Sequence, residues 1–386
     1  MQPLDMEQLQ RWVLGPLVNQ WFARFGAAEK TKERFNVMAK LCRQFLGSSA
    51  KTMWEDSFRK EFYPSVSQPQ FMVSLNKAFE LVAIIGPSLY WQNPSREVKT
   101  ADTPDQVQIA QILGLTDEML LQQVQQQQDE TEAQRTMRNS LATVVLEYIG
   151  RQHPGSVKSD YEMIIQDALV TGRGCGWTET YEDKATGAAC VGTFYAPVDD
   201  LLIDPDAKDP LLRDVKWIAR RHQEPAWVVE RRFGYPAGYL YGRGTNTSFE
   251  FATKGSVQEN AQTLYMDQVE WFEVWSTGGI GARVAGVHGD YGQAIDQLTG
   301  DNCYLCLCRT VPHPLNMPPG LVSQGMPEQI LEALKWRTSR YGSICELWKD
   351  RKWPVETMDF YPIINSTWPM TVLGPGISSL LAMNIL

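Results

Sequence analysis

Residues 161–195 read YEMIIQDALVTGRGCGWTETYEDKATGAACVGTFY, and this stretch decides the fold class of the chain. The capping-box pattern Ser159-Asp-Tyr-Glu162 predicts that a helix begins here, and Gly172 is expected to end it. The hydrophobic period then changes from that of a helix to that of a strand. The runs 175–181 and 189–195 flank a turn and predict an antiparallel hairpin. A helix beside such a hairpin indicates an α+β fold.

Further short strands are expected after this hairpin. Residues 201–203 and 214–221 read as a third and a fourth strand, with the turn Asp204-Pro-Asp206 between them. Pro225 is expected to open a helix that ends at Gly234. Together, residues 159–234 are predicted to form a compact unit of helices and strands.

A second group of strands is expected around residues 269–276, where two kinds of side chain alternate. One face of this strand would carry Trp271, Glu273 and Trp275. Residues 283–287 and 304–308 are its expected partners. Downstream, a helix is predicted from Pro327 to about Lys349, an extended segment from Pro354 to Pro369, and a last helix from near Gly376. The apolar residues 377–386 are expected to dock onto a partner or to continue into a longer chain.

Helices are predicted for most of the first 150 residues. Residues 1–60 contain two apolar helical faces and carry a net charge of +4, which indicates either a solvated face or an arm that docks on an acidic neighbour. Residues 101–135 carry a net charge of −6. A long helix is expected from Thr116 to Ile149, because no Pro or Gly interrupts this range. Its second half has an apolar face made by Met137, Leu141, Val144, Val145 and Tyr148, which is typical of a helix that packs against copies of itself or spans layers.

The composition excludes several protein classes. The formal net charge of −9 over 386 residues argues against a dedicated nucleic-acid-binding domain, because such domains neutralise phosphates with a basic excess. No apolar run approaches the roughly 20 residues of a membrane span, and no signal peptide is recognised. The seven cysteines are expected to be reduced rather than paired as a disulfide framework. The 13 tryptophans indicate subunit interfaces or a large core.

Three clusters of residues resemble binding sites. Cys303, Cys306 and Cys308, with His313, could ligate zinc, but no second pair closes the site and buried strand cysteines explain the same pattern. Six aspartates crowd residues 199–214, together with Lys208 and Arg213, and would suit either a calcium ion or a set of turns. They are Asp199, Asp200, Asp204, Asp206, Asp209 and Asp214. The glycines of 172–176 follow a helix, so a helix end is predicted there rather than a phosphate loop.

No catalytic, cofactor-binding or metal-binding residue is assigned. The four histidines lie near no nucleophile elbow, and the phosphate-loop, kinase and zinc-protease motifs are absent from the sequence. Glu270 and Glu273, near Trp271 and Trp275, suggest a carbohydrate cleft with paired carboxylates. Residues three apart in a strand face opposite sides, however, so this geometry is poor.

The order of these motifs resembles the portal proteins of tailed bacteriophages. The matching pieces are the helix end Asp167-Ala-Leu-Val-Thr-Gly-Arg-Gly174, the hairpin, the segment 198–207 with its Asp204-Pro-Asp-Ala207 turn, and the strand Val215-Lys-Trp-Ile-Ala-Arg-Arg221. The strand 269–275 resembles the one that leads into the portal clip, and 359–376 resembles the return towards the core helix. The resemblance covers roughly residues 135–235 and 265–386.

The resemblance implies four regions in a portal-like α+β chain. They are an N-terminal helical arm or wing region (1–115), a long helix with an α/β wing unit (116–234), a loop and β-rich clip-like region (235–326), and a helical stem with the start of the core helix (327–386). Portal chains usually continue beyond this point, through the core helix into a channel loop and a helical crown.

The resemblance also implies a non-enzymatic, dodecameric ring at one vertex of the virion capsid, assembled in the host bacterial cytoplasm. Such a ring is the channel for genome packaging and ejection. Its implied partners are other copies of the chain, the major capsid protein, the terminase large subunit, head–tail adaptor proteins and double-stranded DNA that passes without sequence specificity. The alternatives are another head–tail connector or tail structural subunit, and a tryptophan-rich hydrolase that acts on polysaccharide. For a portal, we expect an acidic channel face, with the basic excess of residues 1–60 away from the axis.

Overall fold

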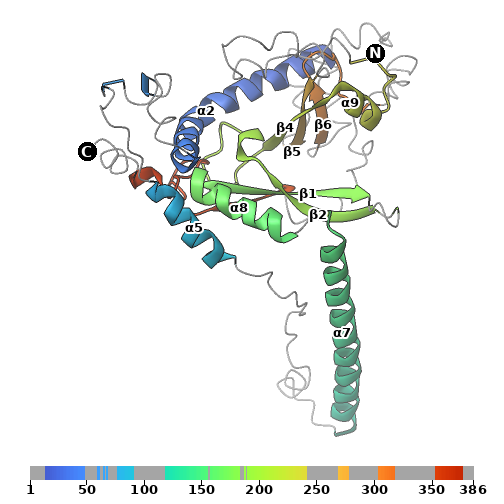
Figure 1. Cartoon of the computed structure of the whole chain (residues 1–386). Helices are drawn as coiled ribbons and strands as arrows, with labels where there is room; N and C mark the ends of the chain where they lie inside the picture. The colour runs from blue at the N-terminus through green and yellow to red at the C-terminus, as the bar shows by residue number, and fades with distance from the viewer. Residues whose placement is uncertain are drawn as a thin grey trace.

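The structure is a computed structural model. It describes residues 14–47, 59–60, 64–65, 67, 76–90, 118–154, 157–182, 187, 189–240, 268–277, 303–317 and 353–376. Helices and antiparallel sheets are both present, so the predicted α+β class is confirmed (Figure 1).

The first sheet forms around the predicted hairpin. Strands β1 (Arg173–Glu182) and β2 (Ala189–Ala196) pair antiparallel, and β7 (Val355–Asp359) pairs with the other edge of β1. Helix α8 (Val157–Thr171) precedes β1, as expected, but it begins two residues before Ser159. The prediction that Ser159 caps this helix is therefore wrong, because the residue lies inside the first turn.

The second sheet has the order β3-β4-β5-β6, and every neighbouring pair is antiparallel. Its strands are β3 (Leu201–Ile203), β4 (Trp217–Pro225), β5 (Gln268–Ser276) and β6 (Cys303–Cys308). The short helix α9 (Ala226–Phe233) follows β4 and ends at Gly234, as predicted. The strands of the expected unit 159–234 are thus shared between two sheets, because β4 pairs with β5 from beyond that unit.

The alternation of β5 explains how the sheets stack. Val269, Trp271 and Trp275 pack into the core between the two sheets, while Phe272 and Val274 pack on the opposite face. The predicted two-faced strand is confirmed. Trp177 of β1 joins the same intersheet core, so the two sheets lie face to face.

Helix α2 (Gly15–Gly47) covers the outer face of the second sheet and then continues to the helices beside the first sheet. Its N-terminal half packs on β3 to β6, and its C-terminal half packs with α5 (Lys77–Leu89) and α8. The helix ends at Gly47, as expected. Of the second apolar face predicted within residues 1–60, Leu41, Cys42 and Phe45 are buried as expected, but Val37 and Met38 are exposed. In this part of the helix the buried side runs through Phe35 and Ala39 instead.

Two 3₁₀ turns complete the described elements. One, at Val198–Asp200, leads into β3, and the other, at Gly374–Gly376, follows the described C-terminal segment. After β7 the chain forms a loop closed by an isolated bridge between Tyr361 and Met370.

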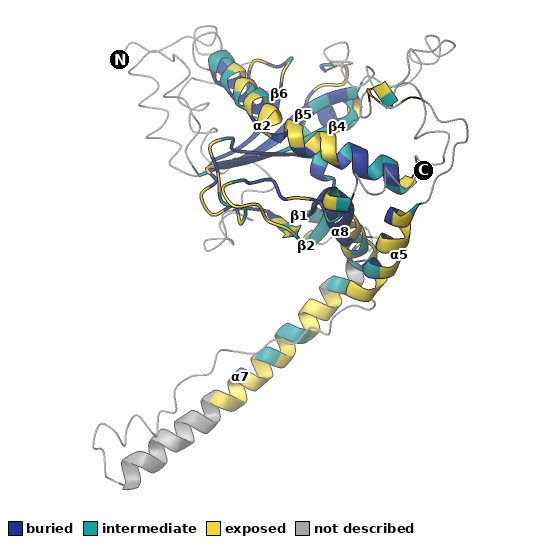
Figure 2. Cartoon of the chain, turned by 90° about the vertical axis from the view of Figure 1, so that its left-hand side faces the viewer, coloured by how far each residue is buried: buried dark blue, intermediate teal, exposed yellow. Residues whose placement is uncertain are grey.

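Helix α7 (Glu118–Gln152) projects from this body as a single long rod (Figure 1). The predicted long helix is confirmed. Its C-terminal end reaches the first sheet, where His153 Nε2 donates a hydrogen bond to the Thr193 carbonyl at 3.0 Å. Figure 2 shows that the side chains along the described part of the rod are mostly exposed.

Several predictions fall outside the described residues. These are the first 13 residues, most of the helical part expected at 48–60, the strand at 283–287, the helix at 327–349 and the last helix beyond Gly376. The four-region division stays a prediction. Within the described helices, none combines the length and apolar character that a membrane crossing requires.

Candidate functional site

The six aspartates predicted as an ion site or a set of turns divide into two groups. Four of them build turns. Asp204 accepts hydrogen bonds from the backbone amides of Asp206 at 3.2 Å and Lys216 at 3.3 Å. Asp214 accepts from the amides of Lys208 and Asp209, and Asp209 pairs with Arg213 at 2.5 Å. The turn interpretation is confirmed for this group.

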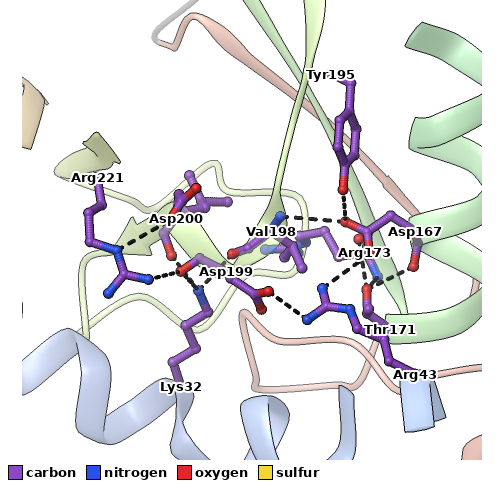
Figure 3. Close-up of polar contacts among 11 residues, drawn as sticks. Lys32, Arg43, Asp167, Thr171, Arg173, Tyr195, Val198, Asp199, Asp200 and Arg221 are labelled. Carbon is purple, nitrogen blue, oxygen red and sulfur yellow. Dashed lines mark hydrogen bonds and ion pairs between the residues drawn. The ribbon is translucent and has the colours of Figure 1, made fainter. Parts of the chain in front are cut away.

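Asp199 and Asp200 belong instead to a partly buried network of charges that we call the charge clamp (Figure 3). The charge clamp consists of Lys32, Arg43, Asp167, Asp199, Asp200 and Arg221. It lies where α2 crosses the 3₁₀ turn at Val198–Asp200, and it joins α2, α8 and β4 through that turn.

Lys32 is the centre of the charge clamp. Its side chain is almost fully buried, and its ammonium donates hydrogen bonds to three backbone carbonyls. These belong to Val198 at 2.6 Å, Asp199 at 2.8 Å and Leu201 at 2.9 Å. An ammonium has three donors, so each has one acceptor here. The ammonium also lies 5.1 Å from the centre of the Trp368 ring, which favours a positive charge.

Arg43 joins α2 to two carboxylates, one on α8 and one in the 3₁₀ turn at Val198–Asp200. Its Nη1 donates to Asp199 Oδ2 at 2.5 Å, and its Nη2 donates to Asp167 Oδ1 at 3.3 Å. The other oxygen of Asp167 accepts from the hydroxyl of Tyr195 at 3.1 Å. The carboxylate on α8 therefore ties α2 to β2.

A second buried ion pair lies beside the charge clamp. Arg173 is fully buried and contacts both oxygens of Asp359 on the neighbouring strand β7, at 2.8 and 2.6 Å. The guanidinium lies 5.3 Å from the centre of the Trp368 ring, which in turn packs against Phe35 of α2. Trp368 thus has Lys32 and Arg173 against it, and it connects the ion pair to the clamp.

Burial and neighbouring charges together shift the pKa values of these groups. It lowers the pKa of Lys32 to about 8, and the nearby Asp199 only partly opposes that shift. Burial raises the pKa of Asp167, although Arg43 acts against it. For Arg43, burial would lower the pKa, but Asp199 and Asp167 outweigh burial and raise it. The clamp residues contact one another, the carbonyls of Val198 and Leu201, and the hydroxyl of Tyr195, which suits the holding of α2 in place.

Sequence reasoning did not find the clamp. Lys32, Arg43, Arg173 and Asp359 come from segments far apart in the chain, so no local motif joins them. One signal was present: Lys32 lies four residues after Ala28 and three before Phe35, both buried on the same side of α2. A lysine within an apolar helical stripe indicates a buried cation with partners elsewhere.

The glycine run at 172–176 has a packing role. Gly172 has a φ of +107°, which ends α8 in a conformation that favours glycine. A Cβ on Gly174 would lie 1.9 Å from the Ile164 carbonyl oxygen, so only glycine lets α8 approach β1 this closely. The predicted helix end is confirmed at this position.

The three strand cysteines face two different sides of β6. Cys306 and Cys308 point into the intersheet core, and Cys303 points towards α2, as the alternation predicts. Burial raises the pKa of the Cys306 thiol. His313 is buried, and its Nδ1 lies 3.5 Å from the hydroxyl oxygen of Tyr235. In the described part of the chain, no three such side chains are grouped as metal ligands.

The two glutamates considered for carbohydrate chemistry lie on opposite faces of β5, as expected. Glu273 faces the intersheet core, where it contacts His222 at 3.2 Å and accepts from the indole of Trp275 at 2.9 Å. Burial opposes its charge, but the hydrogen bond from His222 lowers its pKa overall. The described tryptophans other than Trp227 are buried, so in these ranges they line no open cleft.

Two exposed apolar surfaces contrast with these buried groups. The first, which we call the α7 stripe, follows the C-terminal half of the long helix. It consists of Met137, Leu141, Val144, Val145 and Tyr148. The second is on α5, where Phe79, Leu81, Ile84 and Leu89 are exposed at different positions around the helix rather than along one face.

No protein-family model matches the chain, and no curated protein is significantly similar to it in sequence.

Proposed function

We propose that this chain is a portal-type subunit of a tailed bacteriophage. In this proposal, about twelve copies form a closed ring at one vertex of the capsid, as in the family that the sequence resembles. The ring is the channel for packaging and ejecting double-stranded DNA. It is also the platform on which terminase and head–tail adaptors dock. The subunit performs no chemistry of its own.

The observation that carries this proposal is the exposed α7 stripe. Met137, Leu141, Val144 and Tyr148 follow one another at spacings of four, three and four residues, the repeat by which one helix packs lengthwise on another. Val144 is 62% exposed, and Met137 is 67% exposed. A seam of large apolar side chains on a projecting rod indicates a surface that another chain covers.

The body behind the rod supports the same interpretation. Helix α2 is fixed to both sheets by the charge clamp and by apolar packing on either side of it. A rigid body with a projecting helix suits a subunit that repeats around an axis, because each copy then offers the same two surfaces at the same angle.

The charge of the chain agrees with a channel that does not hold DNA. A net charge of −9 disfavours tight binding of phosphates, so a polymer can pass without being retained. Under this proposal, the wall of the channel is acidic and the basic residues of α2 lie away from the axis.

Negative-stain electron microscopy of the purified chain tests the proposal. We expect closed rings of about twelve copies with a central hole. Open helical polymers would favour a tail structural subunit instead. A monomer that binds polysaccharide would overturn the proposal in favour of the hydrolase alternative.

A further inference from the structure

Helix α7 meets the body of the molecule at its C-terminal end, and the rod extends away from there (Figures 1 and 2). A helix of 35 residues is about 52 Å long, at 1.5 Å per residue. A rotation of about 10° at the base would therefore move the far end of the rod by about 9 Å. The contacts at the base thus decide where the rod lies relative to the body.

His153, the residue that follows α7, lies in a buried socket at this base. Its side chain is only 4% exposed. The socket consists of Asp160 of α8, Tyr181 of β1, and Gly192, Thr193 and Phe194 of β2. One side chain at the end of the rod therefore contacts three elements of the body.

A hydrogen bond attaches this side chain to the edge of the first sheet. In the described part of the chain β2 is an edge strand, and its Thr193 carbonyl oxygen lies 3.0 Å from His153 Nε2. A carbonyl oxygen only accepts, so Nε2 carries the proton and donates it. Two residues along the same strand, the amide of Tyr195 donates to Asp160 Oδ1 at 3.1 Å. His153 and Asp160 thus hold the end of α7 and the start of α8 against neighbouring polar groups of one strand.

Aromatic packing fixes the orientation of the imidazole ring. The ring centre of His153 lies 4.4 Å from that of Phe194 and 6.3 Å from that of Tyr181. Gly192 leaves room for both neighbours, because a Cβ there would lie 3.0 Å from His153 Cδ2 and 3.0 Å from Tyr181 Cε1. The hydrogen bond holds the ring at one point, and the packing prevents rotation about that point.

We propose that His153 is a positioning residue that fixes the direction of α7 relative to the body. The role belongs to the single chain, but its consequence for assembly rests on the proposed function. A ring closes only when every copy presents its two contact surfaces at the same angle. Chains whose rods point in different directions would not close into uniform rings.

Electron paramagnetic resonance measures the direction of the rod through a distance within one chain. Spin labels are attached to ketone-bearing amino acids at Glu132 on the rod and Leu211 on the body, because both side chains are exposed. This chemistry leaves the cysteines unlabelled, and dilution with unlabelled chains removes distances between copies. We expect one narrow distance distribution for the wild type. We expect His153→Ala to lose that narrow distribution and give a broad one.

Three further variants separate positioning from stability. Gly192→Ala keeps His153 but places a methyl group in its seat, so the distribution should broaden as in His153→Ala. His153→Gln keeps an amide donor for the Thr193 carbonyl and should stay closer to the wild type than His153→Ala does. His313→Ala is the matched control, because His313 is 2% exposed but lies beside Tyr235, away from the rod. This control should keep the narrow distribution, and circular dichroism confirms that each variant retains its helices.

Two results would overturn the inference. The first is a distribution in His153→Ala as narrow as that of the wild type. The second is equal broadening in His313→Ala, which would show that a general loss of stability moves the rod.

The outcomes distinguish this inference from the proposed function. If the wild type never forms rings, the portal proposal fails, while the distances within the single chain still test the role of His153. If the wild type forms rings and His153→Ala keeps the narrow distribution and forms equally uniform rings, the positioning role is wrong and the portal proposal stands.

Discussion

Helices α2 and α7 have nearly the same length, 33 and 35 residues, but the fold treats them in opposite ways. Helix α2 buries its apolar side against the second sheet and then against α5 and α8. Helix α7 leaves the α7 stripe exposed along its C-terminal half. An apolar stripe therefore predicts that a surface will be covered, but whether the same chain covers it depends on tertiary structure.

The charged side chains of α2 and α7 differ in the same way as their apolar side chains. Lys32 and Arg43 of α2 have partners on other elements, within and beside the apolar core. Charged side chains of α7, such as Glu132 and Arg138, are exposed. Substitutions around α2 should thus affect the stability of the single chain, whereas substitutions in the α7 stripe should affect assembly. Four changes test this difference.

The largest effect on stability is expected for Arg173→Met. This change leaves the Asp359 carboxylate, which is 10% exposed, without its cation. Loss of one partner from a buried ion pair costs about 3–5 kcal/mol. Chemical denaturation measures the free energy of unfolding. Arg213→Met removes a surface ion pair and should leave that free energy nearly unchanged. Equal effects of both variants would refute the structural role of the Arg173–Asp359 pair.

Gly174→Ala should destabilise the chain by about 1–3 kcal/mol or more, because the added methyl group collides with the backbone of α8 at Ile164. The matched substitution is Gly26→Ala in α2, where a Cβ would meet no atom within 4 Å. That change should stabilise the chain by about 0.5–1 kcal/mol, since alanine favours the helix. Thermal unfolding of both variants shows whether each change stabilises or destabilises the chain. A Gly174→Ala variant as stable as the wild type would contradict the close approach of α8 to β1.

Lys32→Met should destabilise the chain by about 1–3 kcal/mol at pH 7, because three buried carbonyls lose their donor. The pH dependence has a definite sign. Below pH 8, Lys32 is charged in both states; between pH 8 and 10.5 it is neutral when folded and charged when unfolded. The unfolded state then binds more protons, so the stability of the wild type relative to Lys32→Met should rise over this window, by up to about 3 kcal/mol.

The difference in stability between the wild type and Lys32→Met at each pH excludes the contribution of groups that titrate alike in both proteins. Unfolding free energies at pH 7, 8, 9 and 10 supply the measurement. A wild type that loses stability relative to Lys32→Met as the pH rises would contradict the burial of the ammonium.

The smallest effect on the single chain is expected for Val144→Asp. Val144 is exposed in the α7 stripe, so its replacement should change the free energy of unfolding of the unassembled chain by less than about 0.5 kcal/mol. Unfolding at concentrations too low for assembly isolates this quantity. A loss of several kcal/mol under these conditions would show that the stripe is covered within the chain.

The local structure of the described region could largely be predicted from the sequence. The β1–β2 hairpin, the two faces of β5, the end of α9 at Gly234 and the length of α7 all depend on neighbouring residues and their period. The predicted capping box was wrong, because α8 already begins at Val157 and Ser159 lies inside its first turn. Propensity for a cap is a weak preference that the surrounding packing overrides.

The charge clamp could not be predicted, because its contacts join residues as much as 169 positions apart. The sequence indicated a crowd of aspartates, but the cations that select Asp199 and Asp200 from that crowd lie on α2 and β4. The pairing that places β3 and β4 in one sheet with β5 could not be predicted for the same reason, since strand pairing over a long separation leaves no local pattern.

The mass of the assembled protein is the most direct test of the proposed ring. Mass photometry of the wild type and of Val144→Asp, at the same concentration, compares each with the single-chain mass of 43.8 kDa. We expect a discrete wild-type species of about twelve chains and a Val144→Asp protein at the mass of one chain. A wild type that remains at 43.8 kDa at every concentration would contradict it.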